Sequence, residues 1–283
     1  EQVAAKISEV KSGRAAYINT IPGFWPESAA ASLDAKIAEV EATYAESKTA
    51  EERAAQVTAL AETWSAFAAS LTDDNMNQPI SGHYYRMCTP LRANRYATGN
   101  GVDAAITGPT EATTKASIWQ FVKRSDNSYD IINLADGTYI TTSGSPLKCV
   151  ATQPTAGWSI KKADNTGNVI LVSGTAQFNQ QKDGNLHLLN WGDGTNTSDG
   201  GCQYRIIDVT DQVPPQPIVK VEGLGTQTYP YAIDDALADK VFAKENITIA
   251  VDVTMPASMA ADTRYALVCA ADPTQAATGA TKT

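Results

Sequence analysis

The chain has 283 residues, which is enough for about two domains of about 150 residues each. Hydrophobic residues make up 43% of it and charged residues 19%, a composition that excludes wholesale disorder. No run of about 18 apolar residues is present, which excludes a membrane-spanning helix. The formal net charge of −9 argues against nucleic acid as a partner, because phosphates need a basic surface.

The ends of the chain and its cysteines carry little functional signal. The sequence begins at Glu1 without Met or a signal peptide and ends in the polar stretch 276–283, so we expect a processed chain or a piece of a longer protein. Cysteines at C-x-x-C spacing and clustered histidines are both missing, so neither a zinc site nor a histidine cage is expected. We expect the cysteines to be small buried residues, with a disulfide between two of them as the alternative: Cys88, Cys149, Cys202 and Cys269.

Charge and composition divide the chain into three segments. Residues 1–80 carry 6 basic and 12 acidic side chains, residues 81–210 carry 11 and 10, and residues 211–283 carry 5 and 9. The first segment is rich in Ala and Glu, and the second is rich in Thr, Gly, Asn and aromatic residues. Asp and Asn residues before Pro79 mark the first joint, and the Pro-rich stretch 211–217 marks the second. The sequence therefore predicts a multidomain protein.

The first domain, residues 1–75, is predicted to be a three-helix bundle. Apolar residues recur at helical spacing in three stretches: Val3, Ile7 and Val10; Leu33, Ile37, Val40 and Tyr44; Val57, Leu60, Trp64, Phe67 and Leu71. We expect helices from Val3 to about Ser12 and from about Glu27 to Glu46, and a third helix that starts at a capping box, 49–52. The pattern resembles the FIVAR-type helical modules of bacterial surface and carbohydrate-active proteins. We expect a spacer that binds no ligand.

A threefold internal repeat occupies residues 81–210. Each repeat opens with a short strand, and these strands start 44 and 40 residues apart: Tyr85, Tyr129 and Val169. Each repeat closes on an aromatic residue in a later strand, and these residues lie 39 and 46 apart: Trp119, Trp158 and Tyr204. Three such units predict a β-trefoil, because a propeller normally needs four or more blades. In a trefoil the closing aromatics pack toward the shared axis, so we expect them in the core and not in a ligand site.

This part of the chain resembles the ricin-B-type trefoil lectins, whose repeats close on a Gln-x-Trp strand. The first two repeats lack the Gln two residues before Trp119 and Trp158, and the third has Gln203 directly before Tyr204. The resemblance implies the fold and a carbohydrate-binding role. The family's sugar-binding Asp and Asn/Gln set does not transfer to the first two repeats.

One loop of the third repeat has the chemistry of a sugar site, because sugars bind an aromatic platform flanked by planar polar groups. Trp191 lies in a loop rich in Gly, Asp and Asn, and the first two repeats have no Trp at the matching place. We predict Trp191 as the platform, with these hydrogen-bonding partners: Asn190, Asp193, Asn196 and Asp199. In the alternative, Trp191 plugs the open end of the barrel and the polar residues only form turns. The spacing of the oxygen donors misses the EF-hand pattern, so no metal is expected.

The C-terminal segment, residues 217–283, is predicted to be β-rich. Strand patterns occur at 218–221, 247–253 and 265–270, with a helical turn around 234–242. This order resembles the opening strands of concanavalin-like jelly-roll modules, which accompany catalytic domains in secreted bacterial sialidases and related glycoside hydrolases. The resemblance implies the start of a β-sandwich whose remaining strands follow Thr283. A small complete β extension is the alternative.

The chain contains no catalytic motif. The G-x-S-x-G, H-E-x-x-H, P-loop and G-x-G-x-x-G motifs are absent, as are the Arg-Ile-Pro and Ser-x-Asp-x-Gly-x-x-Trp motifs of sialidases. With the resemblances, this predicts the non-catalytic carbohydrate-binding region of a secreted or surface bacterial enzyme that degrades glycans, with a sialidase-like parent. The expected partners are glycans, without a cofactor, for a monomer that is extracellular, surface-bound or periplasmic. The alternatives are a structural or protein-contacting module that binds no sugar, and a trefoil of the protease-inhibitor type.

Overall fold

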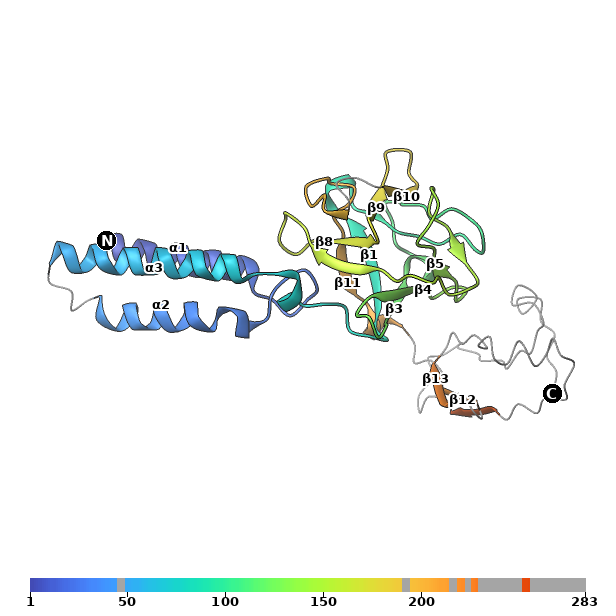
Figure 1. Ribbon diagram of the computed structural model, residues 1–283, viewed down its shortest axis with the longest axis horizontal. Coiled ribbons are helices and arrows are strands. Elements are labelled where there is room, and N and C mark those ends of the chain that lie inside the picture. The colour runs from blue at the N-terminus through green and yellow to red at the C-terminus, as the bar shows by residue number, and fades with distance from the viewer. Residues whose placement is uncertain (45–48, 190–193, 214–217, 222–224, 229–250, 255–283) are drawn as a thin grey trace, which may run out of the picture. The chain divides into compact units, whose positions relative to one another are not determined.

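The computed structural model describes residues 1–44, 49–189, 194–213, 218–221, 225–228 and 251–254 (Figure 1). The chain divides into two compact units, Glu1–Thr210 and Asp211–Thr283. The first unit holds the helices and the threefold repeat, and its described residues share a hydrophobic cluster that extends from Val3 to Ile206. The domain borders suggested by the sequence stay predictions.

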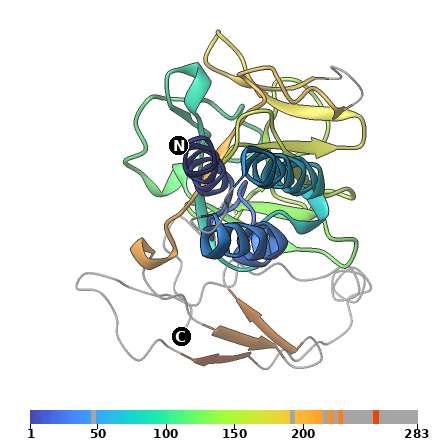
Figure 2. The same ribbon diagram turned by 90° about the vertical axis from the view of Figure 1, so that its left-hand side faces the viewer.

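Three helices form the N-terminal part of the first unit: α1 Gln2–Tyr17, α2 Ala31–Thr43 and α3 Ala50–Ser70. Helices α1 and α2 both pack against α3, and Figure 2 shows the three grouped end-on. Most of the predicted apolar stripe is buried in each helix: Val3, Ile7 and Val10 in α1, Leu33, Ile37 and Val40 in α2, and Leu60 and Phe67 in α3. The prediction is wrong for Tyr44, because its side chain lies just past the end of α2 and is 40% exposed. Among the described helices, none combines the length and the apolar character that a membrane span needs.

The start of α3 agrees with the prediction, whereas α2 begins at Ala31 and α1 ends at Tyr17. The predicted capping box is confirmed, because the Glu52 N–H donates to Thr49 Oγ1 at 3.1 Å and the Thr49 N–H donates to Glu52 Oε2 at 2.9 Å. A 3-10 turn, Glu27–Ala30, precedes α2. Helix α1 continues past its predicted end at Ser12 to Tyr17, whose ring centroid lies 6.0 Å from that of Trp64. Tertiary packing of Tyr17 therefore stabilises a turn that the apolar pattern does not predict.

Six strands of the described repeat region form a closed barrel: β1 Tyr84–Thr89, β3 Trp119–Lys123, β4 Tyr129–Asn133, β7 Ser159–Lys162, β8 Val169–Ser173 and β11 Arg205–Asp208. Antiparallel ladders join β1 to β3, β3 to β4, β7 to β8, and β11 back to β1. Isolated bridges join the two remaining neighbours, Tyr129 to Trp158 and Val169 to Tyr204. The last strand returns to the first, so closure removes the free edges that an open sheet would expose.

A pseudo-threefold axis relates the three repeats. In each repeat a residue of the opening strand pairs with the closing aromatic: Tyr85 with Trp119, Tyr129 with Trp158, and Val169 with Tyr204. Three backbone groups also form a cyclic triangle of hydrogen bonds. The N–H of Ile106 donates to Leu147 O at 2.9 Å, that of Leu147 to Leu186 O at 2.7 Å, and that of Leu186 to Ile106 O at 3.0 Å. Together with barrel closure, this confirms the predicted β-trefoil for about half of the chain.

Short hairpins cap the barrel at the end where the triangle lies. The second repeat contributes β5 Tyr139–Ile140 and β6 Cys149–Val150, and the third contributes β9 Ala176–Gln180 and β10 Leu186–Leu189. In the first repeat a bridge joins Thr98 and Thr107, and β2 Arg95–Tyr96 pairs with β1. The turn 163–168 lies before the start of β8, and the β9–β10 hairpin comes after the end of β8. The turn 163–168 therefore lies at the end of the barrel opposite the hairpins.

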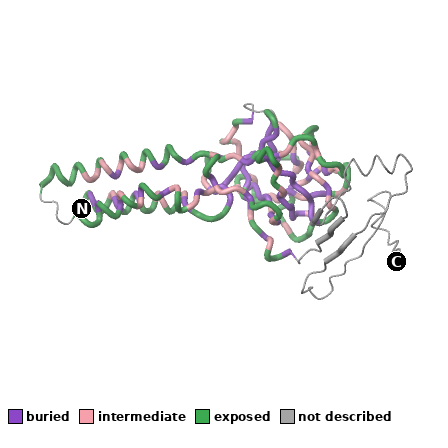
Figure 3. The backbone as a smooth tube through the Cα atoms, turned by 60° about the horizontal axis from the view of Figure 1, so that its bottom comes forward, coloured by how far each residue is buried: buried purple, intermediate pink, exposed green. Residues whose placement is uncertain are grey.

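The closing aromatics lie in the core, as predicted. Trp119, Trp158 and Tyr204 are 0%, 1% and 0% exposed. The ring of Phe178 lies between two of them, with its centroid 5.4 Å from Trp158 and 5.0 Å from Tyr204. Figure 3 shows buried residues concentrated inside the barrel and exposed residues on the outer faces of the helices.

The Tyr204 hydroxyl is buried without a hydrogen-bond partner among the described residues. Burial raises the pKa of this phenol well above its ordinary value, so it stays neutral. We expect Tyr204→Phe to leave the free energy of unfolding unchanged or to raise it by up to about 1 kcal/mol, because the substitution removes an unpaired polar atom and keeps the ring. Urea denaturation followed by circular dichroism measures this.

Tyr129→Phe is the matched control, because the Tyr129 hydroxyl donates to Pro79 O at 2.8 Å in an equally buried place. This variant should lose about 1 kcal/mol of stability. An equal loss in both variants would contradict the expectation for Tyr204.

The cysteines and the second unit complete the fold. Cys88, Cys149 and Cys202 are free and buried as expected, and Cys269 lies outside the described residues.

In the second unit β12 Ile218–Val221 pairs with β13 Gly225–Thr228 and with β14 Val251–Thr254, both antiparallel. Strand β12 confirms the prediction for 218–221, and β14 overlaps the predicted strand at 247–253. Strand β13 is not predicted, because its sequence lacks the apolar alternation of a strand. The predicted turn at 234–242 and strand at 265–270 lie outside the described residues.

Candidate functional site

The loop predicted to bind sugar follows β10 in the third repeat. Asn190, Trp191 and Asp193 lie outside the described residues, so their roles stay predictions. Asn196 and Asp199 are described and belong to segment 194–201, which we call the third-repeat loop. Both are partly buried, and both hold hydrogen bonds that shape this loop.

Asn196 organises the turn of the third-repeat loop. Its Oδ1 accepts from the backbone N–H of Asp199 at 3.1 Å and from the N–H and hydroxyl of Ser198 at 3.3 and 3.2 Å. The buried Gln177 side chain pairs with the Asn196 backbone, accepting from its N–H at 3.2 Å and donating to its carbonyl at 2.8 Å. The side-chain oxygen of Asn196 is therefore used within the loop, as in an Asx turn.

Asp199 connects the loop to its surroundings. Its Oδ1 accepts from Asn179 Nδ2 at 2.9 Å and from the Gly201 N–H at 2.8 Å. Its Oδ2 lies 3.5 Å from a terminal nitrogen of Arg92, and the Asp199 side chain keeps 21% of its surface exposed. A carboxylate held in this way is oriented and still within reach of a ligand.

Asn179 and Arg92, which the sequence pattern does not single out, both contact Asp199, and Gln181 in turn contacts Asn179. Asn179 lies in β9 and is 1% exposed, and its Oδ1 accepts a short hydrogen bond from Gln181 Nε2. Arg92 comes from the first repeat, in the 3-10 turn Pro90–Arg92 that follows β1. The run of amides at 179–181 is a signal that could have identified two of them, whereas nothing local relates Arg92 to a loop a hundred residues away.

The buried thiol of Cys202 lies next to Asn179. Asn179 Nδ2 lies 3.0 Å from Cys202 Sγ, and burial raises the pKa of the Cys202 thiol to about 11. The thiol is therefore protonated at neutral pH and is not a nucleophile, since only the thiolate attacks. Among the described residues no group of three or more His, Cys, Asp or Glu side chains is arranged to hold a metal.

The cluster of Arg92, Asn179, Gln181 and Asp199 combines an amide pair, a carboxylate and a guanidinium in one partly buried place. All four groups are planar: the two amides have donors and acceptors, the carboxylate has acceptors, and the guanidinium has donors. Adjacent sugar hydroxyls also donate and accept in pairs, so such groups fix the orientation of a polyol. The arrangement therefore suits the binding of a polar ligand.

No protein-family model and no curated protein sequence matches the chain. The ricin B-like lectin of Macrolepiota procera, solved in complex with lactose, is 17% identical, with a TM-score of 0.38 over 46% of this chain and 98% of that one. The Rhizoctonia solani agglutinin is 16% identical, with a TM-score of 0.39 over 46% and 99%. The GlcNAcα1-4Gal releasing endo-β-galactosidase of Clostridium perfringens is 15% identical, with a TM-score of 0.39 over 45% and 33%.

These similarities cover about half of the chain. The assignment of the β-trefoil rests on the barrel closure and on the triangle of Ile106, Leu147 and Leu186. The resemblances to FIVAR-type modules and to sialidase-associated modules stay predictions.

Proposed function

We propose that this chain binds carbohydrate through its third repeat, as the non-catalytic part of a secreted or surface enzyme that degrades glycans. The observation that carries the proposal is the cluster of Arg92, Asn179, Gln181 and Asp199, whose planar polar groups are already oriented by one another. Groups that are ordered before binding lose less entropy when a ligand arrives. A glycan is therefore a ligand that this cluster suits.

In the sequence the predicted platform, Trp191, follows β10 and comes shortly before the third-repeat loop that contains Asp199. An indole gives the C–H face of a sugar an apolar surface, while the polar cluster takes up its hydroxyls. The parent enzyme, with sialidase-like character, is supported by the resemblance of residues 217–283 to concanavalin-like modules. We propose an extracellular or surface location and a monomeric state.

A glycan array probed with the full chain tests the function, followed by titration of the best ligand with variants. We expect Trp191→Ala and Asp199→Asn each to weaken binding about tenfold or more, which corresponds to about 1.4 kcal/mol. The matched control is Tyr44→Ala, which removes an aromatic ring that is 40% exposed on the helices. Its affinity should equal that of the wild type.

Unchanged affinity in both loop variants would remove the site. An array without any specific glycan, together with a protein retained in a pull-down, would favour the protein-contacting module instead. The parent enzyme is tested separately by sequencing the gene beyond the codon for Thr283. Ser-x-Asp-x-Gly-x-x-Trp motifs there would support it, and a different catalytic domain would contradict the sialidase-like part of the proposal.

A further inference from the structure

We propose that the helical segment positions the third-repeat loop through the turn 163–168 between β7 and β8. The effect of this coupling on sugar binding rests on the proposed function, whereas the coupling itself does not. The proposal follows a continuous series of contacts from the segment after α1, across the base of the barrel, to the loop that contains Asn196 and Asp199.

The first step is a close approach of two backbones. The N–H of Gly167 donates to Gly23 O at 3.0 Å. Both glycines have positive φ angles, +82° and +88°. A Cβ on Gly167 would lie 2.4 Å from the Phe24 ring, and a Cβ on Gly23 would lie 2.9 Å from the Gly167 backbone. Only glycine satisfies both the conformation and the contact, so this junction is built for close packing.

The second step anchors Gly23 to the helices. The N–H of Gly23 donates to Asn77 O at 3.2 Å, and the N–H of Asn77 donates to Phe24 O at 2.8 Å. Next to them, Trp25 is 4% exposed and its Nε1 donates to Thr72 O at 3.0 Å, just past the end of α3. The segment that touches the turn is therefore part of the packed base of the helices.

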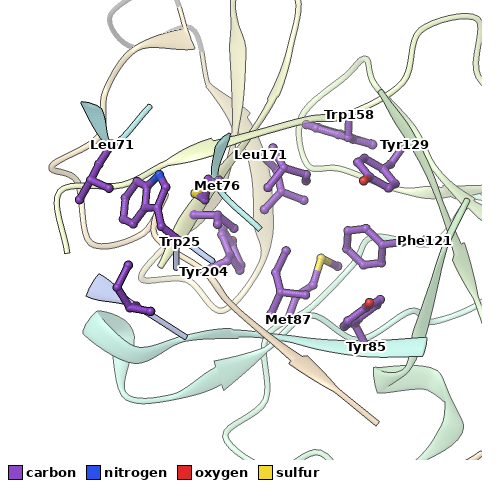
Figure 4. Packing of buried hydrophobic residues seen from close by; sticks show 14 of the residues in the cluster. Trp25, Leu71, Met76, Tyr85, Met87, Phe121, Tyr129, Trp158, Leu171 and Tyr204 are labelled. Carbon is purple, nitrogen blue, oxygen red and sulfur yellow. The ribbon is translucent and has the colours of Figure 1, made fainter. Parts of the chain in front are cut away.

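Strand β7 carries further ties to the same base. The backbone N–H of Lys162 donates to Asp73 Oδ1 at 2.6 Å, and its Nζ donates to Leu71 O at 2.9 Å, at the end of α3. In Figure 4 the buried side chains of Trp25, Leu71 and Met76 continue the row of barrel residues that includes Tyr204. The segments that follow α1 and α3 thus pack against the end of the barrel opposite the hairpins.

The third step leads from the turn to the loop. The N–H of Asp164 donates to Thr197 O at 3.1 Å, and its Oδ1 accepts from the Thr197 hydroxyl at 2.5 Å. Asn165 Nδ2 donates to Oε1 of Gln203 at 3.0 Å, and Gln203 Nε2 donates to Ser198 O at 3.2 Å. Gln203 is 1% exposed, and its buried side chain links the turn 163–168 to the third-repeat loop.

Thr197 and Ser198 separate Asn196 and Asp199, the two described residues among those that the sequence predicts to bind sugar. The turn 163–168 contacts the segment after α1 on one side and Thr197 on the other. It therefore holds the middle of the third-repeat loop in place. A loop ordered before binding binds with higher affinity than the same loop when it must first be ordered. Gly167, Asp164 and Gln203 are positioning residues in this account, and none of them needs to touch the ligand.

The experiment compares Gly167→Ala with Gly144→Ala in the full chain. Gly144 has a φ of +86°, and a Cβ added there would meet no atom within 4 Å, so alanine brings the same backbone strain without a contact to the helices. We expect Gly167→Ala to raise amide hydrogen exchange in residues 194–201 about tenfold and to weaken glycan binding about tenfold. Gly144→Ala should leave both at their wild-type values.

A second variant, Thr197→Val, keeps the shape of the side chain and removes the hydrogen bond to Asp164. It should raise exchange in the same residues about threefold while the helices keep their wild-type exchange. Exchange at 194–201 that is the same in Gly167→Ala and Gly144→Ala would overturn the coupling. If the wild type binds no glycan, the proposed function fails, and the exchange measurement still decides whether the helices hold the loop.

Discussion

Trp119→Ala is expected to lower the free energy of unfolding by about 3–5 kcal/mol. The indole is 0% exposed, and its Nε1 donates to Ala97 O at 2.8 Å. Trp119 also pairs through its backbone with Tyr85, where β3 meets β1 and the first repeat closes. The substitution therefore leaves a large cavity in the barrel and a carbonyl without its donor. Urea denaturation followed by circular dichroism measures the loss.

The control for Trp119→Ala is Val102→Ala, at an apolar side chain that is 38% exposed on the trefoil. It should change stability by no more than about 0.5 kcal/mol. A loss below about 1.5 kcal/mol for Trp119→Ala would mean that the closing aromatics do not hold the barrel together, and the role assigned to them would be wrong.

Arg124→Ala is expected to cost about 3–5 kcal/mol, because it leaves a buried carboxylate unpaired. The side chains of Arg124 and Asp130 are 15% and 7% exposed, and two guanidinium nitrogens donate to Asp130 Oδ1 at 2.9 and 2.6 Å. Arg124 also donates to Thr155 O at 2.7 Å, and Gln153 Nε2 donates to Asp130 Oδ2 at 2.6 Å. The pair thus holds the segment before Trp158 against β4.

Two comparisons make the Arg124 result specific. Lys36→Ala breaks an exposed helical pair with Glu39 and should cost no more than about 0.5 kcal/mol. The double variant Arg124→Met with Asp130→Leu removes both charges and should regain much of the loss, since apolar residues of similar size often replace a buried ion pair without penalty. A double variant as unstable as Arg124→Ala would contradict a charge-based explanation.

The candidate site is only partly predictable from sequence. The sequence suggests Asp199 because an acidic residue in a Gly-rich loop is typical of a ligand group, and the structure places it between Asn179 and Arg92. The sequence does not reveal Asn179, because this residue lies in strand β9 and nothing local indicates that its amide bonds to Asp199. It does not reveal Arg92 either, because this residue belongs to another repeat, and only barrel closure brings β1 beside the third repeat.

Elements whose cause is local follow from the amino-acid sequence alone. The capping box at Thr49 needs only four consecutive residues, and the recurring aromatics predict three repeats because each repeat must bury one at the same place in the barrel. How these elements join depends on contacts between distant parts of the chain. The contact of Gly23 with Gly167 and the approach of Arg92 to Asp199 unite residues more than a hundred positions apart. The first contact depends on packing of the segment after α1 against the barrel, and the second depends on closure of the barrel, so no local propensity encodes either.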